Sequence, residues 1–241
     1  MHRRTAIFDD VSALDHAVAS FLANAVGAAV REQGGCNLVL PGGPFVRPIY
    51  TELAQFQLPW SEVTFYFTDE RCVPPSHPAS NFGEAVDKFL KNPRIDAFQF
   101  RRIEAELPDR ERAAEEYERT LPEWFDVALL ELGADGHVAA LWPHSPVLSE
   151  RERLVVPVSA PTRPAQRITL APRAFERVRE AAIVAVGPDR SRHVARALAP
   201  EGTADATVAE EPVRLLSQAA WFLDRAAASE LSAARAARPA R

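Results

Sequence analysis

The sequence predicts an α/β protein with a mostly parallel sheet and helices on both faces. Short apolar runs of strand length alternate with segments of helical period along most of the chain. Glycine-containing or charged corners follow several of the apolar runs directly, as expected of strand–helix units in a parallel sheet. There is no internal repeat and no linker, so we expect residues 1–241 to form one domain.

The composition is that of an ordinary globular protein. Of the 241 residues, 47% are hydrophobic and 25% are charged, which excludes disordered and fibrous classes. The net charge of -5 gives no electrostatic reason to expect a nucleic-acid partner. We find no 18-residue apolar run, and acidic residues follow the N-terminus where a signal peptide would be apolar. We therefore expect a cytoplasmic protein without membrane contacts, as a monomer or weak homo-oligomer.

The first predicted elements surround a glycine turn. A helix is expected over residues 11–33, because its apolar positions follow helical spacing and Gly34 and Gly35 end it. A strand over 36–40 and a helix near 46–56 flank the turn Pro41-Gly42-Gly43-Pro44. Strand, glycine turn and helix aim backbone N–H groups at an anion. Both prolines lack an N–H group, which weakens the anion-binding interpretation.

Three charged residues follow the next predicted strand, at 63–67, with its β-branched and aromatic residues. Asp69, Glu70 and Arg71 are either a solvated strand end or a functional group at the sheet edge. Ser80 and Asn81 then open a helix over 82–90, and either side chain could cap it. Because capping explains only one of the two residues, a ligand role for Asn81 needs support from elsewhere.

The corner at residues 132–137 is the centre of the functional hypothesis. It follows a buried-strand pattern at 127–130, and the carboxyl edge of such a strand is where open α/β sheets bind ligands. Gly133 and Gly136 permit a tight turn around Asp135. His137 is the one side chain there that exchanges a proton near neutral pH. The alternative is a simple tight turn with a surface histidine.

The remaining pattern continues the alternation of strands and helices. Two cysteines, Cys36 and Cys72, cannot form a disulfide framework or a four-ligand zinc site, and we predict no metal. We expect strands at 154–158, 167–170, 182–186 and 218–223, helices at 110–120, 174–179 and 191–198, and a tail over 225–241 that starts helical and frays.

Taken together, three blocks resemble the 6-phosphogluconolactonase family, in a superfamily shared with glucosamine-6-phosphate deaminases. The blocks are Asp69 to Pro75 with Ser80-Asn81, Gly133 to His137 with Leu141-Trp142-Pro143, and Arg167 to Leu170, and the ending Trp221 to Asp224 also matches. The resemblance covers nearly the whole chain. It implies a doubly wound, Rossmann-like α/β fold with a mostly parallel sheet. It also implies hydrolysis of 6-phosphogluconolactone, a small phosphosugar lactone, without metal or nucleotide cofactor.

The resemblance also implies site residues. His137 would be the catalytic base on water, Asp135 would lie in its loop, and Asp69 and Arg71 would face them. Gly42 and Gly43 would lie in a phosphate loop, and Asn81 would be a pocket residue that binds substrate. Arg167 and Arg71 would hold the phosphate or lactone oxygens. Arg190 stands where the family has a lysine on the phosphate side. Arginine suits this task because its planar fork matches phosphate.

The chain departs from the family pattern around the phosphate. Pro41 to Val46 stands where the family usually has Ser-Gly-Gly-Ser-Thr-Pro, so two hydroxyls and two N–H donors are lost. Glu131 replaces a usual glycine. These changes leave the chemistry at His137 less affected than the phosphate clamp. We therefore keep a second hypothesis, in which the protein binds phosphate more weakly or acts on a different lactone substrate.

Two further functions stay open at this point. An amino-sugar-phosphate deaminase or isomerase would need another acid soon after the corner, and residues 138–142 contain none. A catalytically inactive sugar-phosphate-binding protein is suggested by the altered phosphate loop. The first would release ammonia from glucosamine 6-phosphate, and the second would be stabilised by ligand without lactone turnover.

Overall fold

The computed structural model describes residues 4–200 and 206–231, and six parallel strands form its main sheet. Their order is β1-β9-β8-β5-β2-β3, as predicted for a mostly parallel α/β fold. The strands are β1 (Thr5–Phe8), β2 (Cys36–Leu40), β3 (Val63–Phe67), β5 (Phe125–Glu131), β8 (Val178–Ala185) and β9 (Ala220–Asp224). Apolar residues with almost no exposure fill the central strands, as expected where both faces are covered.

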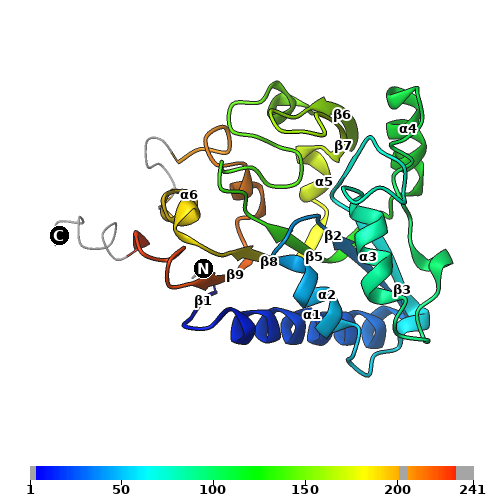
Figure 1. Ribbon diagram of the computed structural model, residues 1–241, viewed down its shortest axis with the longest axis horizontal. Helices are drawn as coiled ribbons and strands as arrows, with labels where there is room; N and C mark the ends of the chain where they lie inside the picture. The colour runs from blue at the N-terminus through cyan, green and yellow to red at the C-terminus, as the bar shows by residue number, and fades with distance from the viewer. Residues whose placement is uncertain (1–3, 201–205, 232–241) are drawn as a thin grey trace.

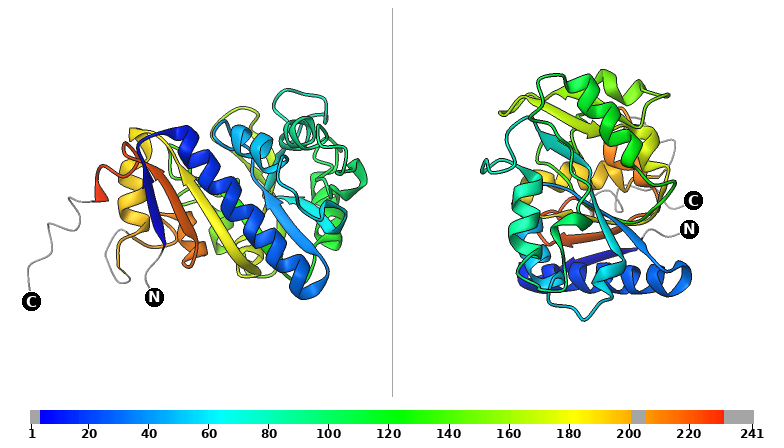
Figure 2. Two further views of the ribbon diagram at one scale, coloured as in Figure 1. Left: turned by 90° about the horizontal axis from the view of Figure 1, so that it is seen from below. Right: turned by 90° about the vertical axis from the view of Figure 1, so that its right-hand side faces the viewer.

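Helices cover both faces of this sheet (Figure 1). Helix α1 (Val11–Gln33) and α2 (Val46–Leu53) lie on one side, and α5 (Pro172–Phe175) and α6 (Ser191–Ala197) on the other. Helices α3 (Asn81–Phe89) and α4 (Arg110–Thr120) complete the chain's helical part. Figure 2 shows α1 running along the sheet from below. The prediction of a doubly wound α/β fold is confirmed.

Helix α1 illustrates how sequence pattern and packing agree. Asp10 caps it by accepting from the N–H groups of Ser12 and Ala13, both at 3.2 Å, and Gly34 ends it with φ 80°. By length and composition alone α1 could cross a membrane, which our search for long apolar runs overlooked. Half of its most apolar window is buried, and its inner residues join the core. This burial favours a core helix.

A second, antiparallel sheet was not predicted. Its order is β4 (Asp69–Arg71), β7 (Gln166–Leu170), β6 (Val155–Ser159), and Arg71 pairs directly with Arg167. The charged run that follows β3 is thus a strand itself rather than a solvated strand end. Thr68 begins this new pairing, because its carbonyl accepts the Leu170 N–H at 2.8 Å. Short polar strands escape a search for apolar runs.

Several predicted boundaries were wrong. The helix expected over 174–179 ends at Phe175, and β8 already begins at Val178. Strand β1 was not predicted. Residues 225–230 form turns where a helical start was expected, and most of the predicted tail, 232–241, lies outside the described residues.

The strand order places the candidate site. Strand β2 lies between β5 and β3, and all three run parallel, so the segments that leave their carboxyl ends start beside one another. Those segments are the glycine turn at 41–45, the charged run at 69–71 and the corner at 132–137. Three motifs that are far apart in the sequence therefore meet at one sheet edge.

Candidate active site

The corner after β5 folds so that the imidazole of His137 turns back over the backbone. The Gly133 N–H donates to the His137 carbonyl at 2.8 Å, and the Gly136 N–H donates to the Gly133 carbonyl at 3.0 Å. Gly136 has φ 80°, a conformation that side-chain-bearing residues rarely adopt. A Cβ at Gly133 would overlap the imidazole ring. Both glycines are thus needed for the position of His137.

An aspartate and a tryptophan hold this imidazole. His137 Nδ1 forms a hydrogen bond with Asp135 Oδ1, and Trp142 Nε1 donates to Asp135 Oδ2 at 2.9 Å. The Trp142 ring stacks on the imidazole, with centroids 5.0 Å apart. Burial opposes the ionisation of Asp135, but the hydrogen bonds from His137 and Trp142 and the charge of protonated His137 outweigh it and hold the pKa of Asp135 well below the ordinary value. Asp135 is therefore ionised and orients the ring.

Asp69 and Arg167 connect the corner to β4. Asp69 is buried, accepts from the Thr68 hydroxyl at 2.9 Å, and lies 3.9 Å from Arg167 Nη1. The Arg167 guanidinium is 5.1 Å from the centroid of the Trp142 ring, which packs on His137. Thr162 accepts from Arg167 Nη2 at 2.9 Å. Arg167 thus links the charged run after β3 with the histidine corner.

Arg71 and Asn81 form the side of the site next to the glycine turn. Arg71 Nη1 donates to the Asn81 side-chain oxygen and to the Ala79 carbonyl, the latter at 3.2 Å. Asn81 Nδ2 donates to the Asp69 carbonyl at 2.8 Å. A Cβ at Gly42 would overlap the Asn81 side chain. Among described residues, buried Arg71 Nε lacks a hydrogen-bond partner, which marks unused donor capacity in the site.

Glu70 and Ser80 resolve two questions that the sequence left open. Ser80 is the helix cap, since its hydroxyl accepts the Gly83 N–H at 3.0 Å, and this leaves the Asn81 side chain for the site. The Glu70 carboxylate accepts from the N–H groups of Asn81 and Phe82 at 2.8 and 2.9 Å. Burial raises the pKa of Glu70, against the hydrogen bonds of its four donors. Glu70 therefore anchors the start of α3.

The glycine turn at 41–45 receives a carboxylate from the neighbouring strand. Glu131, the last residue of β5, accepts the Phe45 N–H at 3.0 Å. Gly43 has φ 139°, and a Cβ there would overlap the Glu131 carboxylate. Burial raises the pKa of Glu131 to about 7, although the Phe45 N–H, the positive charge of Arg190 and that of His137 in its protonated form favour the ionised carboxylate. Sequence reasoning noted this glutamate but did not place it in the site.

Arg190 bridges the corner and the glycine turn. Its Nε donates to the Leu132 carbonyl at 2.8 Å, and its guanidinium lies 4.9 Å from the centroid of the Phe45 ring. All nine predicted site residues therefore belong to one connected group of side chains and glycines at this sheet edge. Trp142 and Glu131 are the members that sequence reasoning missed as site residues. An aromatic residue soon after the corner was the available signal for Trp142.

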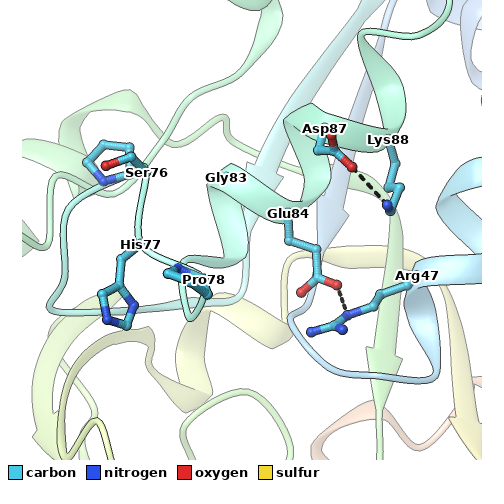
Figure 3. Close-up of a pocket in the computed structure, with 9 residues that line it drawn as sticks. Arg47, Ser76, His77, Pro78, Gly83, Glu84, Asp87 and Lys88 are labelled. Atoms are coloured by element: carbon cyan, nitrogen blue, oxygen red, sulfur yellow. Dashed lines mark hydrogen bonds and ion pairs between the residues drawn. The ribbon is translucent and has the colours of Figure 1, made fainter.

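A separate pocket of about 340 Å³ opens beside this group (Figure 3). It lies between the loop at 75–78, the first turn of α2 and one side of α3, and Glu84 forms an ion pair with Arg47 in its wall. It shares no lining residue with the predicted site. No cluster of three or more histidine, cysteine or acidic residues suited to a metal is present among the described residues.

A family model matches most of the chain. The family, described as glucosamine-6-phosphate isomerases/6-phosphogluconolactonase, matches residues 9–223. A 6-phosphogluconolactonase of Mycobacterium tuberculosis is 34% identical over 250 residues, covering 93% of this chain and 97% of the relative. The human GDH/6PGL endoplasmic bifunctional protein is 33% identical over 193 residues, a match to 73% of this chain but only 24% of that protein.

Solved structures agree with this result. A 6-phosphogluconolactonase from Shewanella baltica superposes with a TM-score of 0.82 at 26% identity, covering 92% of this chain and 98% of the other. A monomeric glucosamine-6-phosphate deaminase has a TM-score of 0.80 at 17% identity, covering 94% and 99%, and supports the fold alone. The chain therefore belongs to the glucosamine-6-phosphate isomerase/6-phosphogluconolactonase family.

Proposed function

We propose that this protein hydrolyses 6-phospho-D-glucono-1,5-lactone to 6-phosphogluconate, a step of the oxidative pentose phosphate pathway. Relatives that match nearly the whole chain carry the name 6-phosphogluconolactonase. The observation that carries the proposal is the hydrogen bond between His137 Nδ1 and Asp135. It prepares the imidazole at the sheet edge as a base.

His137 acts as the general base on water. In its neutral form the ring, with its Nδ1 proton held by ionised Asp135, presents the lone pair of Nε2 to water. Nε2 takes one proton from water, and the oxygen of that water bonds to the lactone carbonyl carbon. The ring C–O bond of the tetrahedral intermediate then breaks, and the imidazolium returns the proton to the leaving alkoxide. Such base catalysis contributes typically ~10²–10⁴ in rate.

Arginines supply the positive charge that this reaction needs. Arg167 and Arg71 lie opposite each other on β7 and β4 and face the lactone or phosphate oxygens in the proposal. Arg190 and the N–H groups of Gly42 and Gly43 serve the phosphate end, and Asn81 holds Arg71 in place. Asp69 limits the freedom of Arg167. A δ-lactone is an activated ester, so a base and an oxyanion donor suffice for hydrolysis.

Lactone hydrolysis by wild type and His137→Ala tests the proposal, with spontaneous hydrolysis subtracted. We expect the variant to lose on the order of 10²-fold or more in kcat, as for a removed general base. Circular dichroism and the melting temperature of the variant serve as controls for folding. Full lactonase activity in His137→Ala would contradict the proposal.

The other assignments follow from this function. A soluble phosphosugar substrate and free cysteines fit a cytoplasmic enzyme, and the location, the lack of nucleic-acid and membrane partners, and a monomer or weak homo-oligomer stay predictions. An amino-sugar-phosphate deaminase would release ammonia from glucosamine 6-phosphate, and an inactive binding protein would be stabilised by 6-phosphogluconate without turnover. Both assays use the same purified protein.

A further inference from the structure

The glycine turn has few N–H donors, and one of them is already used. Pro41 and Pro44 have no N–H group, so within 41–45 the donors are Gly42, Gly43 and Phe45. The Phe45 N–H, at the start of α2, donates to the Glu131 carboxylate at 3.0 Å. The same carboxylate packs against Gly43 so closely that a Cβ there would overlap it. An anion of the chain itself therefore sits where the turn would hold a ligand anion.

The surroundings of Glu131 contain charges of both signs. From the corner and from the segment before α6, His137 and Arg190 favour its ionised form, and the Phe45 N–H does the same. From α3, Glu84 opposes ionisation, although Glu84 itself pairs with Arg47 of α2. The Tyr50 hydroxyl of α2 donates to the Pro41 carbonyl beside the turn. Glu131 thus lies between the groups that favour its ionised form, His137 and Arg190, and the acidic side chain of Glu84, which opposes it.

We propose that Glu131 is a specificity-determining residue that sets how well the turn at 41–45 accepts a phosphate. Its ionised carboxylate competes with the phosphate for the Phe45 N–H group and for the positive charge of Arg190. Protonated Glu131 donates a hydrogen bond to the incoming phosphate and removes one like charge. A lactone without phosphate has no anion at that end and does not meet this competition. The inference rests on the proposed lactonase function and concerns its substrate class.

The proposal predicts a dependence of substrate preference on pH. If only the protonated form admits phosphate, the apparent affinity scales with the protonated fraction of Glu131. Since the pKa of Glu131 is raised to about 7, that fraction falls about fourfold between about pH 6 and about pH 7.5. The preference for phosphorylated over plain gluconolactone, measured as a ratio of kcat/KM values and divided by the same ratio in Glu131→Gln at each pH, falls by the same factor in the wild type.

Glu131→Gln is the decisive variant, with Glu115→Gln as its matched control. Glutamine keeps an oxygen for the Phe45 N–H and cannot ionise. Glu115 pairs with Arg119 on the exposed surface of α4, so its replacement removes the same charge elsewhere. Near pH 7.5 we expect Glu131→Gln to raise the ratio of kcat/KM for the phosphorylated over the plain lactone about fourfold or more. The substrate phosphate titrates near pH 6 in every variant, so the comparison between variants cancels it.

Binding of the products gives a second readout that does not need turnover. Calorimetric titration with 6-phosphogluconate and with gluconate should show the same selective gain in Glu131→Gln. An unchanged ratio of the two affinities, or an equal gain for both products, would overturn the role of Glu131. If the wild type hydrolyses neither lactone, the proposed function fails, and the binding ratio still decides the role of Glu131.

Discussion

The histidine corner and the glycine turn lie at the same sheet edge but differ in how their polar groups are used. In the corner, Asp135 is bonded to both His137 and Trp142, and the imidazole is oriented for chemistry. In the turn, an N–H group that a ligand would need is bonded to Glu131 of the same chain. In terms of the proposed function, the imidazole at the end proposed to react is already oriented, whereas a donor at the end proposed to bind phosphate is already bonded to the protein itself.

The largest expected effect comes from breaking the corner. Asp135→Asn leaves the size of the side chain unchanged but removes the charge that orients His137, and its single amide oxygen can accept from His137 Nδ1 or from Trp142 Nε1 but not from both. We expect kcat to fall on the order of 10²-fold for phosphorylated and plain lactones alike, because the loss lies at the reacting end. Initial rates on both substrates check this. A loss confined to the phosphorylated lactone would contradict the division between the two regions.

The pH dependence of protein stability tests the role of Glu131 in the glycine turn. The pKa of Glu131 is raised to about 7 in the folded protein, above its ordinary value near 4.5. Its contribution to stability is therefore fully present below about pH 4.5 and is lost as the pH rises through about 7. We expect Glu131→Gln to be more stable than wild type near pH 8, by roughly 1–3 kcal/mol in the free energy of unfolding.

Urea unfolding of Glu131→Gln and Glu115→Gln at several pH values checks this expectation. The stability difference between Glu131→Gln and wild type should shrink as the pH is lowered below the raised pKa. Glu115→Gln should follow the wild type throughout, because that side chain is exposed and paired only with Arg119. A pH-independent difference would show that the ionisation of Glu131 does not oppose folding.

Two glycines with positive φ provide a matched test of the turn. Gly43 has φ 139° and lies against the Glu131 carboxylate, whereas Gly34 has φ 80° and open space within 4 Å of the point where a Cβ would lie. Gly34→Ala should lower the free energy of unfolding by about 1 kcal/mol, through backbone strain alone. Gly43→Ala should lower it by more, up to about 3 kcal/mol, because the new Cβ also overlaps the Glu131 carboxylate. Thermal unfolding measures both. Equal losses would argue against close packing of Glu131 on the turn.

Trp142→Phe should have the smallest effect. Phenylalanine keeps the aromatic stack on His137 and the contact with Arg167 but cannot donate to Asp135 Oδ2. Loss of one hydrogen bond to a charged group corresponds to about 1.5–3 kcal/mol at most, and water can replace it at this half-exposed carboxylate. We therefore expect a several-fold loss of kcat on both lactones, smaller than that of Asp135→Asn. Steady-state rates of the two variants decide the order.

The sequence predicted the strands that are apolar and the motifs that follow them. β2, β3 and β5 are recognisable because buried parallel strands read as short apolar runs, and their order explains why the three motifs meet. Strand β4 was not predicted, because Asp69 to Arg71 is charged and its partner strand β7 lies about a hundred residues further along the chain. Pairing between distant polar strands leaves no local pattern.

The sequence predicted which residues form the site better than it predicted how those residues contact one another. The blocks that resemble a family led to His137, Arg71 and Arg167, but the bond from His137 to Asp135 depends on how the glycine corner folds. Likewise, the approach of Glu131 to Gly43 depends on the register of β5 against β2. Such contacts follow from tertiary geometry rather than from residue spacing.

The most direct test of the account compares His137→Ala and Glu131→Gln on phosphorylated and plain gluconolactone side by side. We predict that His137→Ala lowers kcat on both lactones by a similar large factor, whereas Glu131→Gln raises the ratio of kcat/KM for the phosphorylated over the plain lactone. Wild-type rates on both lactones provide the reference, with spontaneous hydrolysis subtracted. Retention of full activity by His137→Ala would contradict the account at its centre.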